Sequence, residues 1–338
     1  MPSPKIATWF VADDQDNATF FPQVGGRSDV PQFQEIYWRC IVCFFASSLA
    51  VNPDAEHVLY TNTKVPTVDG MDLKLLLSKW GVEVIALPIS KRLAAGSVSS
   101  WGNQFYVFDV IQHHASSGSG SDLLLLDSDM IWLRPVDELV ADLGRFGALT
   151  YELGDDEHPL NEAINGQSRA GLALFAQEHG LQAVDMVPYC GGEFYAATAE
   201  RNAAVARQAE ALWADVLAQG QTAPREEAHL LSVIYALEGI KIGTGNRYIR
   251  RMWTTFRHNN LRGEDEALTL WHLPSEKRTG FRDLFQQIAA AQSCNPRSDG
   301  PRMGLDRANY ARMMGFPRRR PFKLVRDLWM KVAEKLSS

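Results

Sequence analysis

The sequence predicts an α/β protein with a Rossmann-like, mainly parallel sheet flanked by helices. In residues 1–130, apolar runs alternate with amphipathic helical segments in the order β, α, β, α, β, α, β, a pattern typical of parallel strands joined by crossover helices. One run contains four consecutive leucines, as expected for a strand buried on both faces. With 338 residues, 46% of them hydrophobic, the chain can form a large core.

The expected elements of the first half are strands at 6–12, 57–61, 82–88 and 123–127, and helices at 33–50, 72–80 and 101–114. Gly81 is suited to a helix C-terminus because glycine readily adopts the left-handed conformation found there. The second half is more mixed, with helices expected at 136–143, 164–179, 199–219 and 224–237, and strands at 148–152, 184–198, 240–242 and 268–273. We therefore predict one domain over 1–295, divided at residue 130 into halves 1–130 and 131–295.

Residues 296–338 are predicted to form a basic, helical C-terminal tail. They contain 11 Lys and Arg against 4 Asp and Glu, a charge of +7, so the remainder carries -6 - 7 = -13. Phe322, Val325, Leu328 and Trp329 fall on one helical face, with Val332 and Leu336 continuing it. The tail is either a solvated or packing helix, or a peripheral attachment to an anionic membrane.

Other global features exclude several classes of protein. A net charge of -6 argues against general nucleic-acid binding. The N-terminal sequence has a short apolar run followed at once by acids, which fits neither a signal peptide nor a membrane anchor, so we expect a cytoplasmic protein. Four cysteines form no disulfide framework, and the Cys40 and Cys43 pair is expected to be buried in a helix.

The segment DLLLLDSDMIWLRP carries the most informative motif. A buried parallel strand ends at the sheet edge where open α/β folds bind ligands, so Asp127 and Asp129 would both emerge at a crevice. Two like charges about 5 Å apart at an effective dielectric near 20 repel by roughly 3 kcal/mol, which a divalent cation would reverse. Carboxylates suit Mg²⁺ or Mn²⁺, and these cations commonly bind substrate phosphates. The alternative is that the two acids only cap a turn.

This motif resembles the DxD motif of the GT-A superfamily of glycosyltransferases, and the resemblance covers most of residues 5–292. It implies a nucleotide-binding half at 1–130, an acceptor-binding half at 131–295, and a Mn²⁺ or Mg²⁺ ion that bridges the diphosphate of a nucleotide sugar. Ser128, between the two acids, is required to be small and joins the donor-binding residues.

A histidine and a lysine follow a late strand in LTLWHLPSEKRTGF. His272 can supply a third metal ligand, and Lys277 can neutralise the charge of a departing diphosphate. A similar pair occurs in the glycogenin-like and lipopolysaccharide galactosyltransferase-like families. Those families have glycines where this chain has Pro274, Ser275 and Glu276, so Arg278 is the alternative phosphate ligand.

The run PYCGGEFYAAT places Gly191 and Gly192 before Glu193 within an expected strand. Consecutive glycines permit the close approach of a substrate or another backbone, or mark a β-bulge. By resemblance to GT-A enzymes, this segment lies beside the donor sugar and the acceptor. Glu193 is therefore a candidate catalytic residue.

Glu226 and Glu227 open an expected helix in PREEAHLL, where negative charge is favourable. The sequence also resembles the acidic helix start of blood-group-like transferases, which implies that Glu227 lies under the donor sugar. A carboxylate there can stabilise an oxocarbenium-like centre, act as a nucleophile or deprotonate the acceptor. Glu226 is the second candidate for this role.

The end of the first strand contacts the nucleobase and ribose in this superfamily, which makes Thr8, Ala12 and Asp13 donor-site candidates. Asn103 and Gln104, before the DxD strand, either contact the nucleotide or lie on a solvated helix face. The resemblance implies transfer from a nucleoside diphosphate sugar, expected to be a UDP sugar, to a glycan, glycolipid or glycoprotein hydroxyl, with retention at the anomeric carbon. The alternatives are an inverting enzyme with Glu227 or Glu226 as base, a sugar-nucleotide nucleotidyltransferase and a non-catalytic carbohydrate-binding scaffold.

Overall fold

The computed structural model describes residues 4–21, 25–94, 96, 100, 102–154, 163–255, 258–316, 321–325, 328–329 and 332. Its centre is a six-stranded sheet in the order β10-β11-β8-β1-β4-β7. These strands are β1 (Lys5–Phe10), β4 (Glu56–Thr61), β7 (Glu83–Ala86), β8 (Leu123–Leu126), β10 (Ala148–Glu152) and β11 (Cys190–Ala197). β8, β1, β4 and β7 are mutually parallel, whereas β11 runs antiparallel to both β8 and β10. The predicted mainly parallel α/β fold is confirmed.

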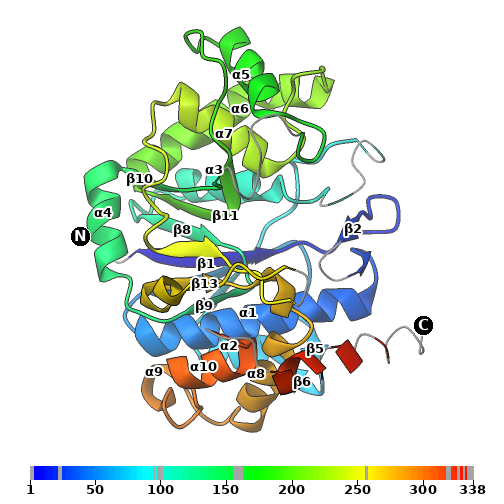
Figure 1. Ribbon diagram of the computed structural model, residues 1–338, viewed down its shortest axis with the longest axis vertical. Coiled ribbons are helices and arrows are strands. Elements are labelled where there is room, and N and C mark those ends of the chain that lie inside the picture. The colour runs from blue at the N-terminus through cyan, green and yellow to red at the C-terminus, as the bar shows by residue number, and fades with distance from the viewer. Residues whose placement is uncertain are drawn as a thin grey trace.

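Two layers of helices cover this sheet (Figure 1). One layer contains α3 (Tyr106–Ser116), α5 (Arg169–Glu178), α6 (Ala199–Ala218) and α7 (Glu227–Leu237). The other contains α1 (Pro31–Val51), α2 (Leu73–Lys79), α8 (Gly280–Ala290), α9 (Pro296–Asp299) and α10 (Arg307–Met314), and α4 (Asp137–Phe146) packs against β10. Buried side chains of the sheet and of both layers form one continuous hydrophobic core.

A small second sheet lies between the large sheet and α1 (Figure 1). It contains β12 (Ile249–Arg251), β13 (Leu270–His272) and β9 (Met130–Trp132), with β13 central, parallel to β12 and antiparallel to β9. Two further pairs are β2 (Phe20–Phe21) with β3 (Gly26–Arg27), and β5 (Thr67–Val68) with β6 (Met71–Asp72). The register of β13 places His272 opposite Met130, directly after the DxD motif.

Local capping explains several element boundaries. The side chain of Asp72 accepts a hydrogen bond from the Leu75 amide at the start of α2, and Gly81 adopts φ +73° just beyond its end, as predicted. α5 begins at Arg169, five residues later than predicted, because Ser168 caps it by accepting from the Gly171 amide. Cys40 and Cys43 are buried free thiols on α1, as predicted.

The predicted strand at 240–242 is wrong. The segment forms a turn region after α7, bounded by Gly239 at φ +62° and Gly243 at φ +75°. Ile240 is buried there, and its amide donates to the Tyr235 carbonyl. Its apolar character therefore reflects anchoring of a loop, and the strand of this region is β12.

The first part of the predicted tail packs into the protein. α9 contacts α1, and α10 contacts α8. Met303, Tyr310, Met314 and Phe316 are each at most 2% exposed and belong to the main core. Within the described residues, no helix is both long and apolar enough to cross a lipid bilayer.

Candidate functional site

The carboxyl end of β8 presents the two acids of the DxD motif to a cavity. The four leucines of β8 are buried, and β9 begins at Met130, so the residues between the two strands form a short connection at the sheet edge. The Asp127 amide donates to the Glu193 carbonyl, and the Asp129 carbonyl accepts from the Leu273 amide, both at 3.0 Å. The motif is therefore fixed by its backbone to β11 on one side and to the end of β13 on the other.

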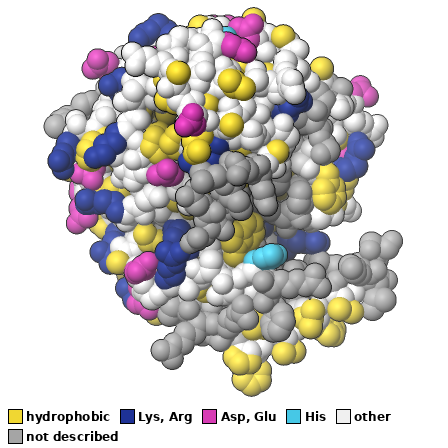
Figure 2. Space-filling model, turned by 45° about the horizontal axis from the view of Figure 1, so that its top comes forward, with side chains coloured by type: hydrophobic (Ala, Val, Ile, Leu, Met, Phe, Trp, Pro, Cys, Tyr) yellow, Lys and Arg dark blue, Asp and Glu magenta, His cyan; other side chains and the backbone are white. Residues whose placement is uncertain are grey.

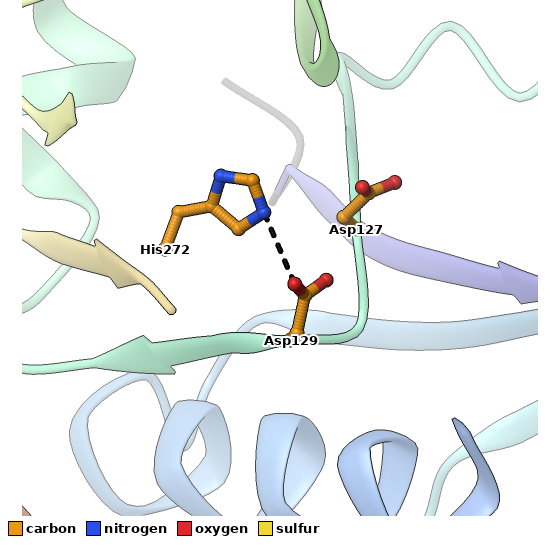
Figure 3. A group of neighbouring side chains, drawn as sticks. All are labelled: Asp127, Asp129 and His272. Carbon is orange, nitrogen blue, oxygen red and sulfur yellow. Dashed lines mark ion pairs between the residues drawn. The ribbon is translucent and has the colours of Figure 1, made fainter. Parts of the chain in front are cut away.

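Asp127, Asp129 and His272 form a possible metal-binding group. Each offers one ligand atom, and these three atoms lie within 4.8 Å of one another. The imidazole of His272 points toward Asp129, with Nε2 3.2 Å from Oδ2 (Figure 3). Two carboxylates and one imidazole form a donor set that suits a divalent cation such as Mn²⁺. The structure therefore brings His272 together with the two acids.

Lys277 reaches the same carboxylate. It follows the short 3₁₀ helix η2 (Pro274–Glu276), and its Nζ donates to Asp129 Oδ2. Its side chain is only 4% exposed, and Nζ lies 5.5 Å from the centre of the Tyr37 ring. The ammonium is thus held in the interior, beside the possible metal ligands.

The charges in this cluster shift several pKa values. Burial raises the pKa of Asp127 to about 6, with Asp129 adding to the effect. For Asp129 burial acts in the same direction, but Lys277 and His272 outweigh it and hold its pKa below the usual range. Burial opposes protonation of His272, yet Asp129 and Glu193 raise its pKa to about 9. The cluster therefore favours ionised Asp129 beside positive partners.

Glu193 lies behind His272 on β11. Its carboxylate accepts two hydrogen bonds of 2.8 Å from Arg251, and its Oε1 is 3.2 Å from Nδ1 of His272. Burial opposes ionisation of Glu193, but Arg251 and His272 lower its pKa. The imidazole therefore has Nδ1 near Glu193, at an ion-pair distance without a hydrogen bond, and Nε2 toward Asp129.

Gly191 and Gly192 make room for two carboxylates. A β-carbon at Gly191 would overlap the side chains of Glu193 and Tyr151, and one at Gly192 would overlap Glu227. The pairing of β10 with β11 is also irregular here, because Thr150 pairs with Tyr195 while Glu152 pairs with Cys190. The two glycines therefore accommodate neighbouring side chains within a strand segment of irregular pairing.

Glu227 is the first residue of α7 and lines the cavity at 7% exposure. Its Oε2 is buried and accepts no hydrogen bond from the protein. Burial raises its pKa well above the usual value, and Glu226 and Asp127 add to the shift. These surroundings therefore favour the protonated form of the Glu227 carboxyl.

Glu226 lies at the N-cap position of α7 and also lines the cavity. Asn165 donates to its Oε2, and its Oε1 is 3.2 Å from Nε2 of the fully buried His229. Burial raises the pKa of Glu226 to about 7. The two acids thus retain protons to a higher pH than isolated carboxyl groups do.

The candidates near the first strand occupy different places. Asn103 and Gln104 line the cavity, whereas Thr8, Ala12 and Asp13 are not among its lining residues. Asp13 is buried in an ion pair with Arg92 and accepts from the Asn103 side chain at 3.2 Å. Asp13 therefore supports Asn103 from behind.

The cavity has a volume of about 640 Å³. Its lining includes Ser128, Gly192 and the acids and cations described above, together with an aromatic group that the sequence did not single out: Trp9, Phe10, Phe21, Phe33, Tyr37, Tyr189 and Trp253. Arg251 and Asn165 were also missed, because neither occurs in a motif and each reaches the site only through the fold. The lining thus combines aromatic side chains with strongly charged ones.

Comparisons with known proteins give limited similarity. No family model matches the chain, and no curated protein sequence matches it. Among solved structures, the chain is similar to an active-site mutant of LgtC, with 12% identity and a TM-score of 0.48, over 88% of this chain and 99% of that one. It is also similar to the galactosyltransferase LgtC in complex with donor and acceptor sugar analogs, with 11% identity and a TM-score of 0.47 over the same shares of the two chains.

Proposed function

We propose that this chain is a metal-dependent glycosyltransferase of the GT-A type that transfers a sugar from a nucleoside diphosphate sugar to a hydroxyl group. The observation that carries the proposal is the convergence of Asp127, Asp129 and His272, with Lys277 on Asp129, in a cavity large enough for a nucleotide sugar. Hard-cation ligands beside a buried ammonium suit a diphosphate, whose negative charge both can bind.

In this proposal Asp127, Asp129 and His272 hold a divalent cation, with Mn²⁺ preferred because one ligand is an imidazole. The ion would supply Lewis-acid stabilisation of the leaving diphosphate. Lys277 exchanges part of its contact with Asp129 for the phosphate oxygens, and Glu193 keeps His272 oriented from behind. The residues of the chain therefore concentrate positive charge where the leaving group develops negative charge.

The aromatic side chains of the lining suit the nucleobase and ribose of the donor, which we expect to be a UDP sugar. Trp9, Phe10, Phe21 and Tyr37 offer flat apolar surfaces, and Asn103 and Gln104 offer amide groups at the same cavity. Stacking on an aromatic ring combined with hydrogen bonds to the base edge is a general mode of nucleobase binding.

Glu227 lines the same cavity, and in this proposal the transferred sugar is bound beside it. The cause of its raised pKa, burial next to Glu226 and Asp127, favours a carboxyl that donates a hydrogen bond to the sugar or acceptor over a permanently ionised base. We expect retention at the anomeric carbon. Replacing Glu227 with Gln preserves a hydrogen-bond donor, so a small loss of turnover supports donation, and a loss above about 100-fold supports a nucleophile or base.

The acceptor is proposed to be a hydroxyl of a glycan, glycolipid or glycoprotein. The helical residues 321–325 and 328–329, which we call the C-terminal helix, offer a reason to favour a lipid-linked acceptor. Phe322, Val325, Leu328 and Trp329 are 91%, 67%, 66% and 69% exposed. Figure 2 shows hydrophobic side chains that project at the lower edge of the face it draws. With the basic residues of the same segment, these side chains suit the surface of an anionic membrane.

The proposal is tested by measuring the release of nucleoside diphosphate from a panel of nucleotide sugars, with and without Mn²⁺. Mn²⁺-dependent release of UDP from at least one UDP sugar is expected, and the Asp129→Asn variant should abolish it. Asp185→Asn, at an exposed position, is the matched control. Absence of release from every donor would favour a carbohydrate-binding scaffold, and release of pyrophosphate during sugar-nucleotide synthesis would favour a nucleotidyltransferase.

A further inference from the structure

An ion pair links the C-terminal helix to the loop that carries Lys277. Lys323 Nζ donates to Oε1 and Oε2 of Glu276 at 2.9 and 2.8 Å. The side chains of Lys323 and Glu276 are only 8% and 3% exposed. A pair so well shielded from water interacts more strongly than one on the surface, and loss of one partner leaves a buried charge.

The surroundings of Glu276 are built around its carboxylate. Oε2 accepts from Thr279 Oγ1 at 2.7 Å and from the Gly280 amide at 3.2 Å, and Oε1 accepts from Thr254 Oγ1. A β-carbon at Gly280 would lie 2.9 Å from Oε2, so the glycine leaves the space that the acid occupies. Glu276 therefore fixes the loop between β13 and α8 by several directional contacts.

The C-terminal segment is shaped to bring Lys323 to this acid. Gly315 adopts φ +73° at the end of α10, and a β-carbon there would lie 2.9 Å from Cδ of Lys323. Phe316 packs on Trp271, with ring centres 4.1 Å apart, and Trp271 immediately precedes His272. The segment thus contacts Trp271, which precedes His272 in the chain, and Glu276, which precedes Lys277.

Two acids and two lysines are paired in this region. Lys277 is bound to Asp129, and Lys323 is bound to Glu276, the residue that directly precedes Lys277. Removal of the Lys323 ammonium would leave the Glu276 carboxylate without its cationic partner, and Lys277 is the next residue along the chain. Lys323 thus holds the carboxylate next to Lys277, while Lys277 keeps its contact with Asp129 at the cavity.

We propose that Lys323 is a positioning residue, which keeps Lys277 directed at the candidate diphosphate site by neutralising Glu276. The inference rests on the proposed function, because diphosphate binding is the role of Lys277 that it protects. It also makes the placement of the C-terminal helix a determinant of donor affinity.

The test compares four variants of the full-length chain: Lys323→Met, Lys323→Arg, the double variant Lys323→Met with Glu276→Gln, and Lys74→Met as a matched control at an exposed site. The dissociation constants of UDP and of uridine are measured by calorimetry in the presence of Mn²⁺. Lys323→Met should weaken UDP binding about tenfold, the order of effect found for outer-shell partners. Uridine binding should be unchanged, since uridine carries no phosphate.

The other variants separate positioning from a general structural role. Lys323→Arg should restore most of the UDP affinity, and the double variant should restore it as well, because neither leaves an unpaired Glu276 charge. Unchanged UDP binding by Lys323→Met, equal weakening of UDP and uridine, or no recovery in the double variant would each overturn the inference.

Hydrogen exchange of residues 270–283 distinguishes failure of this inference from failure of the proposed function. If the unmodified chain binds no nucleoside diphosphate, the proposed function fails. Faster exchange of this segment in Lys323→Met, reversed by Glu276→Gln, would still support the link between helix and loop. Exchange that is the same in all variants would overturn it.

Discussion

Gly192 of β11 lies so close to Glu227 of α7 that a β-carbon at position 192 would overlap the Glu227 carboxylate. Strand β11 and helix α7 therefore approach each other at a position where the strand has no side chain, and the Glu227 carboxylate occupies that space. The result is a buried acid that faces the cavity with one oxygen unpaired. The glycine is explained by this carboxylate, and three-dimensional proximity of residues 35 positions apart is what makes the explanation possible.

Gly192→Ala should displace Glu227 and reduce turnover by more than tenfold, since small shifts of reacting groups are costly. The effect on Mn²⁺ affinity should be smaller, because the metal ligands lie on other elements. Gly144→Ala is the matched control: a β-carbon there meets nothing within 4 Å, and the site is within helix α4. Equal turnover of Gly192→Ala and the unmodified chain would contradict this role.

Glu193→Gln should weaken Mn²⁺ binding about tenfold, because the carboxylate behind His272 Nδ1 is replaced by a neutral amide. The substitution also weakens the contact with Arg251, which holds the acid in place. Calorimetric titration with Mn²⁺ measures the change, with the exposed Glu200→Gln as control. An unchanged Mn²⁺ affinity would show that Glu193 does not orient the ligand.

His57 should make the protein sensitive to mild acid. Its Nδ1–H donates to the Ala55 carbonyl and its Nε2 accepts from Ser48 Oγ, so the neutral ring satisfies both partners. Burial, with Arg297 nearby, lowers its pKa to about 4. The pKa of His57 in the folded protein lies below the unfolded value near 6.5. The neutral ring therefore makes its full contribution to the unfolding free energy above pH 6.5, and this contribution is lost as the pH falls toward 4.

The expected loss from His57 is about 2 kcal/mol of unfolding free energy between pH 7 and pH 5. Urea denaturation at the two pH values measures it. His57→Gln should remove that part of the pH dependence, whereas His258→Gln, at an exposed position, should retain it. The same pH dependence in His57→Gln and the unmodified chain would exclude His57 as its source.

The exposed apolar side chains of the C-terminal helix should bind anionic vesicles. Phe322→Ser combined with Trp329→Ser should reduce sedimentation with phosphatidylglycerol vesicles, and salt should weaken what remains because the basic residues contribute by attraction to the lipid charge. Leu174→Ser, at an apolar position of α5 that is 53% exposed, is the control. Membrane attachment would be contradicted if the double variant sedimented with vesicles as much as Leu174→Ser does. It would also be contradicted if the chain lacking residues 318–338 sedimented as much as the unmodified chain.

The sequence predicted the framework well because the framework depends on local patterns. The four leucines before Asp127 gave β8, and the alternation in residues 1–130 gave the parallel strands. His272 was placed near the acids by resemblance, and the antiparallel register of β13 with β9 provides the physical basis. The prediction of a strand at 240–242 was wrong because a buried apolar residue that anchors a loop, such as Ile240, has the same local pattern as one in a short strand.

The details of the site depend on contacts between distant segments, which local patterns do not encode. Arg251 pairs with Glu193 across 58 positions, and Lys323 pairs with Glu276 across 47. Asp13 forms an ion pair with Arg92 and does not line the cavity, which is also a result of packing between distant segments. Such pairs are apparent only when the sheet edge and the loops around it are assembled.

We propose that Asp127, Asp129 and His272 bind a cation that in turn binds a nucleoside diphosphate. Calorimetry of UDP binding with and without Mn²⁺, in the unmodified chain and in Asp129→Asn, tests it most directly. Mn²⁺ should strengthen UDP binding at least tenfold in the unmodified chain, the scale of a favourable binding coupling, and Asp129→Asn should remove this gain. UDP binding that is independent of Mn²⁺, or a gain that persists in Asp129→Asn, would contradict it.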